Sequence, residues 1–528
     1  QARNVFSFLT APNETDYARK MVFIFRNQYL YRKNMHKINL KNLIAGMEIT
    51  ESLGNLSSET ENIAFDSRKV NPGGLFVAIP GEKHDGGTFI KEALDKGATA
   101  IITEASLESL SSLHIDREKV ALLRTSDSRK SLAIVSANFY ENPSAYLSLT
   151  GITGTNGKTT LTYILETLAK ADSKHTGVIG TIDCHFGSAK FPAAMTTPES
   201  LGLNLNLKQM LDAGVTDCFI EVSSHALSQK RVYDMNFDVG IFTNLSRDHL
   251  DFHSDMEEYK NAKAELFRGN TVKTSIVNID DPAGKEFAAE LKENVISTGI
   301  NSSADFSAEN ISLTAVGSRF TLKTPSGSTK IQTNLLGAHN IYNLLSASAY
   351  ALNQGMSLDM IKGTFKNIPS IPGRFESINT GQNFSVLVDY AHTEDALSKA
   401  ITAANAFTRG KVIVVFGCGG DRDKGKRERM GQVAAEKADF SIITSDNPRT
   451  EEPEKIIADI LKGVPASALH TTIINRREAI EYAINRAKKN DLILIAGKGH
   501  ENYQVSGMQK EHFDDREVAR DCLRKQVH

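Results

Sequence analysis

Apolar and polar positions follow two different periods in residues 146–168, and the switch between them is the clearest pattern in the chain. Residues 146–150 alternate apolar and polar side chains, which is typical of a half-buried strand. The ten residues that follow, GITGTNGKTT, are rich in glycine. Apolar residues then recur at helical spacing, at Leu161, Ile164, Leu165 and Leu168. The pattern predicts a strand, a glycine-rich turn and a helix in direct succession.

The turn has the composition of a phosphate-binding loop. Gly154 and Gly157 allow successive backbone N–H groups to converge on phosphate oxygens, and a helix that begins near Lys158 directs its positive end to the same place. Lys158 would reach the outer phosphates of a nucleotide triphosphate, and Thr159 would hold magnesium. The common G-x-x-x-x-G-K-[ST] pattern has glycine where this chain has Ile152, so we predict a shorter loop, GTNGKTT. The alternative is a glycine turn followed by an exposed helix start.

Two apolar runs downstream of the loop each end in polar residues. Residues 218–222 carry Glu221 and are followed by Ser-Ser-His, and residues 239–243 are followed by NLSRDHLDFH, which contains His249. Ligands gather beyond the carboxyl ends of strands in open α/β sheets, so Glu221 and His249 are candidate metal ligands. Each residue alone is more often an ordinary loop residue, and His is an unusual ligand for magnesium.

A third region begins after NIPSIPGRFE, residues 367–376, where two prolines and a glycine predict a linker. Near-continuous apolar runs follow, separated by segments of helical length, and this pattern predicts a parallel sheet covered on both faces. The runs end near Asp389 and within residues 411–420, 440–449 and 491–501, each in a polar or glycine-rich segment. Four such ends at one sheet edge predict a ligand site. The loop at residues 417–427 would approach anions, unless it is a solvated charged turn.

The front of the chain divides into two parts. We interpret residues 1–34, which contain a basic and aromatic stretch, as an extension that is either disordered or an artefact of the start site. Short strands and turns between residues 62 and 103 predict a small α/β domain. Its polar loops at residues 66–69 and 81–86 are ordinary loops by spacing alone, and a predicted helix at residues 129–139 leads into the phosphate-loop strand.

Composition narrows the class of protein. The 528 residues suggest about three domains. With 61 Lys plus Arg against 63 Asp plus Glu, the formal net charge of −2 does not favour nucleic acid or anionic membrane, and we expect small-molecule partners. The four cysteines are widely spaced, which fits a reducing cytoplasm, and no apolar run approaches the roughly 20 residues of a membrane span. We therefore expect a cytoplasmic protein without membrane insertion.

The motifs taken together closely resemble the Mur ligase family, from about Met35 to the end. The chain carries GTNGKTT, EVSSHAL, TNLSRDHLD, GAHNIYN, PGRFE, DYAHTEDAL, FGCGGDRDKGKR, DNPRTEEP and AGKGHE in the family's order. The resemblance implies an α/β protein of three domains: a small UDP-binding domain at residues 35–125, a central ATPase domain of the phosphate-loop type with a mostly parallel sheet at 126–372, and a C-terminal Rossmann-like domain at 373–528.

The resemblance implies an ATP-dependent amide ligase that works with Mg²⁺ as a monomer. It would join UDP-N-acetylmuramoyl-L-alanyl-D-glutamate to a diamino acid and release ADP and phosphate. The carboxylate would first be phosphorylated, because an amine cannot displace oxide from it, and the amine would then displace phosphate. The catalytic set implied is Lys158, Lys263 and His249.

The family's nucleotide and metal residues match positions throughout the chain. The ATP set comprises Gly154, Thr155, Asn156, Gly157, Lys158, Thr159, Thr160, Asn340, Asn343, Arg374 and Asp389. The metal set comprises Thr159, Glu221, His249 and Lys263, the last as a carbamate formed from CO₂. By spacing alone, Lys263 would be a surface lysine of a helix, and only the resemblance suggests otherwise.

The substrate residues implied by the resemblance fall into two sets. The UDP-muramoyl-dipeptide set comprises Phe65, Ser67, Glu82, Lys83, His84, Thr196, Thr197, Ser223, Gln229 and Arg231. Some relatives have Asn where this chain has Met195. The amino-acid set comprises Arg422, Asp446, Asn447, Pro448, Arg449, Gly497 and Glu501. Because a guanidinium binds a carboxylate through two parallel hydrogen bonds, Arg449 favours meso-diaminopimelate, which carries a second carboxylate, over L-lysine.

Four other functions remain open at this point. The same ligase could use L-lysine, or the chain could be a folate polyglutamate ligase, which shares the short loop. A phosphate-loop switch ATPase would hydrolyse ATP without any amino-acid substrate, and an inactive binding protein would retain only the fold. Residues 66–69 and DNPR favour the peptidoglycan enzyme over the folate enzyme, and the four strand ends of the third region argue against the switch.

Overall fold

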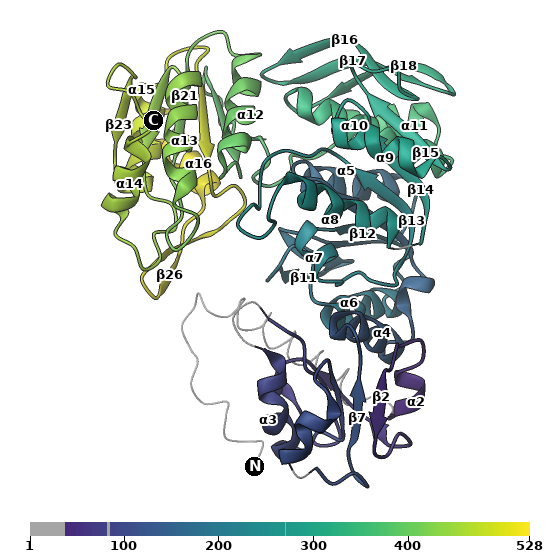
Figure 1. The fold of residues 1–528 in the computed structure, drawn as a ribbon. Coiled ribbons are helices and arrows are strands. Elements are labelled where there is room, and N and C mark those ends of the chain that lie inside the picture. The colour runs from purple at the N-terminus through teal and green to yellow at the C-terminus, as the bar shows by residue number, and fades with distance from the viewer. Residues whose placement is uncertain (1–36, 82–84, 114, 270, 528) are drawn as a thin grey trace, which may run out of the picture. The chain divides into compact units, whose positions relative to one another are not determined.

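The computed structural model describes residues 37–81, 85–113, 115–269 and 271–527 (Figure 1). The predicted extension at residues 1–34 and the loop residues 82–84 lie outside the described residues. The chain divides between Glu141 and Asn142 into two compact units, which are described separately. None of the helices in the described ranges combines the length and the apolar character needed to cross a membrane.

The first unit is a small α/β domain that extends to Glu141, beyond the predicted boundary at residue 125. Its described sheet has the strand order β2-β7-β6-β5-β4, with β4 to β7 parallel and β2 antiparallel to β7. The strands are β1 Ile38–Asn39, β2 Glu51–Leu53, β3 Glu59–Thr60, β4 Ile63–Ala64, β5 Leu75–Val77, β6 Ala100–Thr103 and β7 Ala121–Arg124. The helices are α2 Leu40–Leu43, η1 Ser67–Lys69, η2 Gly86–Phe89, α3 Ile90–Asp95, η3 Leu107–Leu113 and α4 Ser128–Phe139. Asp127 caps α4 by accepting from the backbone N–H groups of Arg129 and Lys130.

The second unit contains a central sheet built around the predicted strand–turn–helix. The strand order is β11-β10-β9-β12-β8-β13-β14-β15-β16-β17-β18. Strands β9 to β16 of this order are parallel, and antiparallel strands close both ends. The bounds are β8 Ser148–Thr153, β9 Thr176–Ile179, β10 Asp183–Phe186, β11 Ala189–Pro192, β12 Asp217–Glu221, β13 Asn236–Phe242, β14 Thr271–Asn278, β15 Val295–Gly299, β16 Phe306–Thr314, β17 Gly317–Thr324 and β18 Gly327–Thr333.

Helices cover both faces of the central sheet. Their bounds are η4 Pro143–Ala145, α5 Lys158–Ala171, α6 Ser200–Asp212, α7 Ser224–Ser228, α8 Met256–Arg268, α9 Pro282–Leu291, α10 Ala338–Asn353 and α11 Leu358–Lys366. Successive residues of β12 pack in different hydrophobic cores, because successive side chains point to opposite faces of the sheet. Phe219 packs with α5, α10 and α11, whereas Ile220 packs with α6, α8 and α9. The apolar stripe predicted for residues 161–168 is buried in the first of these cores.

The C-terminal sheet confirms the prediction of a parallel sheet covered on both faces. The strand order is β19-β20-β24-β21-β22-β23, and all neighbours are parallel except β19 and β20. Leu494 packs with α12 to α14 and Ile495 with α15 and α16. The strands are β19 Glu376–Ser377, β20 Ser385–Asp389, β21 Val412–Phe416, β22 Phe440–Ile443, β23 His470–Thr472, β24 Leu492–Ala496, β25 Tyr503–Ser506 and β26 Gln509–His512. The helices are α12 Glu394–Asn405, α13 Gly425–Lys437, α14 Pro453–Leu461, α15 Arg476–Arg486 and α16 Asp515–Val527.

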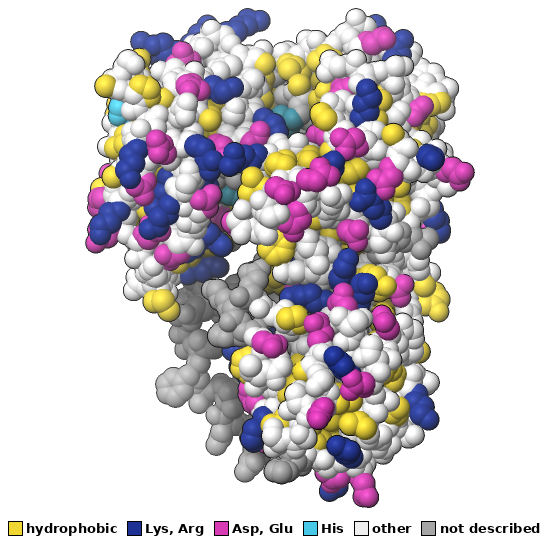
Figure 2. All heavy atoms as spheres, viewed as in Figure 1, with side chains coloured by type: hydrophobic (Ala, Val, Ile, Leu, Met, Phe, Trp, Pro, Cys, Tyr) yellow, Lys and Arg dark blue, Asp and Glu magenta, His cyan; other side chains and the backbone are white. Residues whose placement is uncertain are grey.

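Charged side chains of both signs are intermixed on the face shown in Figure 2, in agreement with the small formal net charge. All four cysteines are described, and each is buried and free.

Asp280, which follows β14, stabilises the turn after β15. Its carboxylate accepts hydrogen bonds from the backbone N–H groups of Ile300, Asn301 and Ser302 at 2.7, 2.9 and 2.8 Å, and from the Tyr342 hydroxyl of α10 at 2.8 Å. Burial alone would raise the pKa of Asp280, but these hydrogen bonds outweigh it and lower the pKa to about 2. The carboxylate therefore contributes stability above its ordinary pKa of 3.8, and this contribution is lost as the pH falls towards 2.

We predict that Asp280→Asn lowers the thermal unfolding midpoint at pH 7, because an amide cannot accept all of these hydrogen bonds. The expected loss is about 1–3 kcal/mol, the contribution of hydrogen bonds to a charged group. Calorimetry at pH 7 and pH 3 should show a smaller difference from the unmodified protein at pH 3. The exposed Glu293→Gln variant is the control and should be neutral. An unchanged midpoint for Asp280→Asn at pH 7 would contradict the assignment.

Candidate active site

The glycine-rich turn lies between β8 and α5, as predicted, and it packs tightly against neighbouring segments. A Cβ on Gly154, whose φ is 141°, would come within 1.9 Å of Thr243 Oγ1, and a Cβ on Gly157, whose φ is 90°, within 2.7 Å of Asn343 Oδ1. Side chains are therefore excluded at both positions. The Lys158 ammonium donates to the carbonyl of Gly154 at 2.7 Å and to that of Thr155 at 2.9 Å, so it lies over the loop.

The segment after β13 supports the loop from behind. The backbone N–H of Thr155 donates to the Asn244 carbonyl at 2.7 Å, and that of Asn156 donates to Asn244 Oδ1 at 3.1 Å. The Thr243 hydroxyl donates to the Asn156 carbonyl at 2.7 Å. Sequence reasoning singled out this strand end for His249 and missed Thr243 and Asn244, which hold the loop in shape.

Glu221 ends β12, and its side chain is buried. Thr159 Oγ1 donates to Glu221 Oε2 at 2.9 Å, so the structure brings together two residues of the predicted metal set. Thr181 donates to the same carboxylate through its hydroxyl at 2.9 Å and its backbone N–H at 2.8 Å. A hydroxyl and a carboxylate at hydrogen-bond distance are the oxygen donors that Mg²⁺ prefers, and the pair therefore fits that ion.

His249 has its side chain near Asp248 and His225. It has a φ of 53°, its Nε2 lies 3.7 Å from Asp248 Oδ2, and its ring packs edge-on against His225, with 4.8 Å between the ring centres. Burial lowers the pKa of His249, which favours the neutral imidazole. Within the part of the chain that the structure describes, no three His, Cys, Asp or Glu side chains are grouped so that they could hold a metal ion.

Lys263 lies on α8 and is buried, so the interpretation from spacing alone, a surface lysine, is wrong. Its ammonium lies 4.2 Å from the centre of the Tyr259 ring rather than against a carboxylate. The Tyr259 hydroxyl is 3.1 Å from Thr155 Oγ1, and this contact links α8 to the phosphate-binding loop. Burial, reinforced by the neighbouring Lys158, lowers the pKa of Lys263 well below its ordinary value.

The predicted linker brings Arg374 to the loop. Arg374 Nη2 donates to Thr159 Oγ1 at 3.1 Å, and the guanidinium lies 4.7 Å from the centre of the Tyr390 ring. Asp389 accepts from the backbone N–H groups of Phe375 at 2.8 Å and Ala391 at 2.9 Å. Burial raises the pKa of Asp389, and Arg374 opposes this shift.

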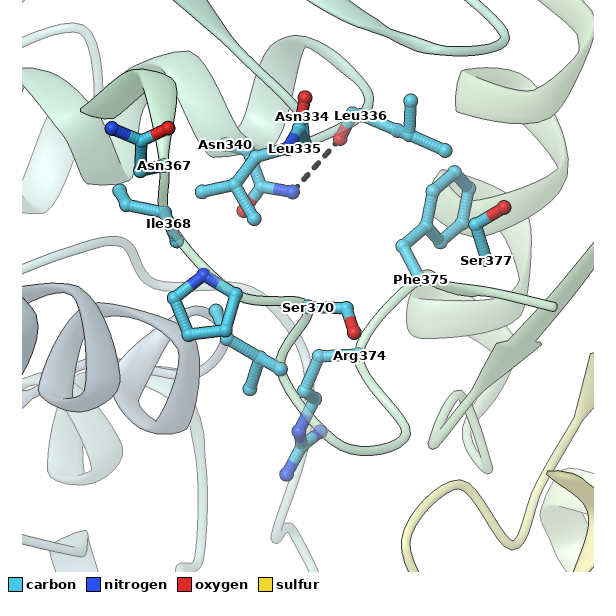
Figure 3. A pocket seen from close by; sticks show the side chains of 12 residues that line it. Asn334, Leu335, Leu336, Asn340, Asn367, Ile368, Ser370, Arg374, Phe375 and Ser377 are labelled. Atoms are coloured by element: carbon cyan, nitrogen blue, oxygen red, sulfur yellow. Dashed lines mark hydrogen bonds between the residues drawn. The ribbon is translucent and has the colours of Figure 1, made fainter. Parts of the chain in front are cut away.

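A cavity of about 420 Å³ lies at the linker (Figure 3). Asn340 and Arg374 of the predicted ATP set line it, and Leu335, Ile368 and Phe375 supply apolar walls. The Asn340 amide donates to the Leu336 carbonyl at 2.8 Å, and Asn343 donates to Asn340 Oδ1 at 3.1 Å, so both asparagines are held in place.

The residues predicted to grip the dipeptide converge around the end of β12. Thr197 Oγ1 donates to the Glu221 carbonyl at 2.7 Å and accepts from the Ser223 backbone N–H at 3.1 Å. Arg231 donates to the Thr197 carbonyl at 2.9 Å and also to the Gln229 side chain. The hydroxyl oxygens of Thr196 and Thr181 are 3.1 Å apart. Arg231 Nη1 lies 3.4 Å from the Met195 sulfur.

The predicted UDP residues belong to the first unit. Phe65 is half-buried, and the buried Ser67 donates its hydroxyl to Glu92 Oε2 at 2.7 Å. Glu82, Lys83 and His84 lie outside the described residues.

Most of the predicted amino-acid set is in mutual contact at the ends of β22 and β24. Asn447 Nδ2 donates to Glu501 Oε2 at 2.9 Å, and the Asn447 backbone N–H donates to Asp446 Oδ1 at 2.6 Å. Arg449 has a φ of 52° and donates to the Gly420 carbonyl at 2.7 Å. The side chain of Arg422 is exposed.

Sequence reasoning missed Lys498 and the β25–β26 hairpin at this site. Lys498 is fully buried and donates to the Tyr503 carbonyl at 2.6 Å and to Asn447 Oδ1 and Glu501 Oε2 at 3.3 Å each. The Val505 backbone N–H donates to Asn447 Oδ1 at 2.9 Å, and the Val505 carbonyl accepts from the Arg449 N–H at 3.0 Å. A lysine directly after an apolar run was the available signal for Lys498, whereas the exposed hairpin has none.

Three family models match the chain in the order of these sites. They are the Mur ligase family catalytic domain at residues 59–140, the Mur ligase middle domain at residues 152–351, and the Mur ligase glutamate ligase domain at residues 373–499. A curated relative from Geobacillus kaustophilus, a UDP-N-acetylmuramoyl-L-alanyl-D-glutamate–2,6-diaminopimelate ligase, is 45% identical over 88% of this chain and 94% of its own length. The chain belongs to the Mur ligase family.

Other relatives agree with the assignment to the Mur ligases. Ligase 1 of the same name from Clostridium acetobutylicum is 42% identical over 92% of this chain and 100% of its own length. A solved structure of a ligase of this name has 31% identity and a TM-score of 0.68, covering 93% of this chain and 100% of that one. The likeness to a folylpolyglutamate synthase from Mycobacterium tuberculosis, with 17% identity, a TM-score of 0.57 and coverage of 76% and 94%, extends to the fold alone. This Mur ligase therefore has the three-domain α/β fold of its family and is an amide-bond-forming ligase.

Proposed function

We propose that this Mur ligase joins meso-diaminopimelate to the D-Glu side-chain carboxylate of UDP-N-acetylmuramoyl-L-alanyl-D-glutamate, with conversion of ATP to ADP and phosphate, in the synthesis of the peptidoglycan precursor. The observation that carries the proposal is the cluster of Asp446, Asn447, Arg449 and Glu501 at one sheet edge, in a chain 45% identical to a diaminopimelate ligase. That cluster has the charges needed to hold an amino acid, which a switch ATPase does not require.

The reaction proceeds in two steps that balance. A carboxylate oxygen attacks the γ-phosphorus of ATP, the bond to the bridging oxygen breaks, and ADP leaves, which yields an acyl phosphate. The neutral amine then attacks the acyl carbon, phosphate departs with the bonding electron pair, and the nitrogen loses a proton. Positioning and charge neutralisation account for most of the catalysis in such transfers.

The phosphate-binding loop positions the triphosphate. The backbone N–H groups of residues 154–160 and the N-terminus of α5 bind the phosphates, and Lys158 moves from the loop carbonyls to the β- and γ-phosphates. Arg374 lies against Thr159 and approaches the same oxygens. Mur ligases use Mg²⁺ with ATP, and the bound ion neutralises phosphate charge. Thr159, Glu221 and His249 would hold it.

We propose that the linker cavity takes the base of ATP. Its volume and its apolar walls suit a purine. Asn340 lines the cavity, and Asn343, which bonds to Asn340, lies next to Gly157 of the loop. Asp389 follows on the next strand end and would bind the ribose. In this arrangement one nucleotide extends from the linker to Lys158.

Lys263 is proposed to carry a carbamate that completes the metal site. A buried, neutral amine is the form that attacks CO₂, and the nitrogen then loses a proton, so a cation is replaced by an anion. The burial of Lys263, the neighbouring charge of Lys158 and the lack of an ion pair to a carboxylate within the described residues support this change of charge. An unmodified lysine could not bind a cation.

The acceptor substrate would be bound by two sets of residues. Thr196, Thr197, Ser223, Gln229 and Arg231 would hold the dipeptide next to Glu221, which places its carboxylate near the γ-phosphate. The UDP portion would contact the following residues: Phe65, Ser67, Glu82, Lys83 and His84. We further propose that the enzyme acts as a monomer in the cytoplasm, where its four free cysteines would stay reduced.

Amino-acid selectivity is assigned to Arg449. Its guanidinium donates to the Gly420 carbonyl through Nη1, which leaves other donors for a distal carboxylate. L-lysine lacks that carboxylate, so its binding would leave these donors without a partner. Arg422, Asp446, Asn447, Pro448, Gly497 and Glu501 would hold the remainder of meso-diaminopimelate.

The purified enzyme should release phosphate from ATP only when UDP-N-acetylmuramoyl-L-alanyl-D-glutamate and an amino acid are both present. Phosphate release is measured with meso-diaminopimelate, with L-lysine and with neither, and mass spectrometry identifies the product. Release that is independent of the amino acid would overturn the ligase proposal. A preference for L-lysine would overturn only the assignment of the amino acid.

Arg449→Ala should raise the KM for meso-diaminopimelate by about 10- to 100-fold, the loss of one charged hydrogen-bonded pair. The KM for ATP should stay within about twofold, because Arg449 belongs to the proposed amino-acid site and not to the ATP set. Steady-state kinetics with each substrate varied in turn provide the measurement. Arg477→Ala, which removes an exposed arginine of the same domain, is the matched control. Equal increases in both KM values for Arg449→Ala would assign Arg449 to the nucleotide or the fold.

Lys263→Ala should lower turnover by about 100-fold or more, because one ligand of the proposed metal site is lost. A small carboxylate such as formate or acetate should restore part of the activity by occupying the space of the carbamate. Mass spectrometry under CO₂ should detect the modification in the unaltered protein. Lys260→Ala, on the same helix but paired outward with Glu286, should retain activity and show no rescue. Normal turnover of Lys263→Ala would remove the carbamate proposal.

A further inference from the structure

Arg476, the first residue of α15, is a fully buried arginine that the reaction described above does not use. Its partner is Asp515, the first residue of α16, whose side chain is also fully buried. Arg476 Nε donates to Asp515 Oδ1 at 2.8 Å and Nη2 donates to Asp515 Oδ2 at 2.7 Å, a paired geometry with two nearly parallel hydrogen bonds. The helices α15 and α16 pack together in the C-terminal domain (Figure 1).

The remaining donors of Arg476 reach the ends of two strands. Nη2 donates to the carbonyl of Ala496, the last residue of β24, at 2.9 Å, and Nη1 donates to the carbonyl of Ser445, just beyond β22, at 3.3 Å. The next residues along the chain are Gly497 and Asp446, both in the proposed amino-acid site. One guanidinium therefore joins the two main-chain positions from which that site is built.

The sheet itself does not set the distance between these two positions. Strand β21 lies between β22 and β24, so no backbone hydrogen bonds connect β22 with β24. Nevertheless their ends lie close together beyond the end of β21: a Cβ on Gly497 would come within 2.8 Å of Asp446 Oδ2. Arg476 is one of the groups that bridge these two strand ends, together with Asn447, whose side chain bonds to Lys498 and Glu501.

Arg476 is itself held on the β22 side. The Ile474 carbonyl accepts from the Ser445 backbone N–H and the Thr444 hydroxyl, both at 3.2 Å, and Asn475 caps α15. The start of α15 is therefore fixed to the end of β22, and the guanidinium extends from there to β24. The Asp446 and Glu501 carboxylates add a favourable charge interaction with the guanidinium.

We propose that Arg476 is a positioning residue for the amino-acid site, which holds the ends of β22 and β24 at the separation that lets Asp446, Asn447 and Glu501 bind one amino-acid head group. This inference rests on the proposed function. Its role is to set the geometry of groups that contact the substrate, and Arg476 does not itself contact the substrate.

The decisive variant is the double substitution Arg476→Met with Asp515→Leu. It removes both buried charges together, which proteins often tolerate, and it removes the bridge between the strand ends. We expect the KM for meso-diaminopimelate to rise about 10-fold or more, because small displacements of binding groups are costly. The KM values for ATP and for the UDP-muramoyl-dipeptide should stay within about twofold.

Two further variants separate positioning from general stability. Arg476→Lys keeps the pair with Asp515 but offers a single ammonium in place of the planar fork, so its KM for meso-diaminopimelate should be intermediate. Ile480→Ala, in the buried core of the same helix, should lower the thermal unfolding midpoint without a selective change in any KM. If the double variant does not fold, Arg476→Lys decides the question, and an unchanged KM for meso-diaminopimelate would overturn the inference.

The same measurements separate this inference from the proposed function. Unmodified protein that fails to release phosphate with meso-diaminopimelate would overturn the proposed function. Unmodified protein that ligates normally, together with a double variant whose three KM values are unchanged or rise in equal proportion, would overturn the role of Arg476 alone.

Discussion

The central domain depends on the buried carboxylate of Glu221. A charge at the end of a central strand is costly unless it is hydrogen-bonded, and Glu221 accepts from the Thr159 hydroxyl and from both the hydroxyl and the backbone N–H of Thr181. Thr159 belongs to the helix of the phosphate-binding loop, and Thr181 contacts the segment that contains Thr196 and Thr197. The hydrogen bonds to this one carboxylate thus connect the nucleotide side of the site with the acceptor side.

The positive charges of the site are arranged around this carboxylate. Lys263 is buried and Lys158 is half-buried, and desolvation together with the neighbouring cations lowers the pKa of each. Arg374 adds a third cation from the linker. Anionic phosphates suit such a cluster, and the proposed carbamate on Lys263 would convert one of its members into a metal ligand. The charge states of these side chains depend on their desolvation as much as on which residues are present.

The C-terminal domain also pairs buried charged and polar side chains at the end of its sheet, but with a different set of residues. The carboxylate of Glu501 and the amide of Asn447 meet at the end of the sheet, and the buried Lys498 lies beneath both. Arg476 and Asp515 form a second buried layer below the strand ends. In both domains a parallel sheet brings polar residues to one edge, and buried ionic groups behind that edge set the exact spacing.

The sequence alone predicted the parts whose signals are local. Alternation and helical spacing gave β8 and α5 because each depends on neighbours within a few residues, and the long apolar runs gave the C-terminal sheet for the same reason. The polar strands β16 to β18 and the exposed hairpin β25–β26 were missed, because these segments hold few apolar residues that could mark an alternation. The positions of polar residues at strand ends indicated Glu221 and His249, and the family's motifs supplied further site residues, including Arg449.

Only the tertiary structure decided how these residues are used. Spacing placed Lys263 on a helix surface, but the packing of α8 against the loop buries it beside Tyr259. The contacts of Thr243 with the loop, of Lys498 with Asn447 and of Arg476 with two strand ends join positions far apart in the chain. Burial and through-space distance depend on how the whole sheet is assembled. Local residue patterns therefore determined the helices and strands and the candidate chemistry. Packing determined which side chains are in contact and in which charge state.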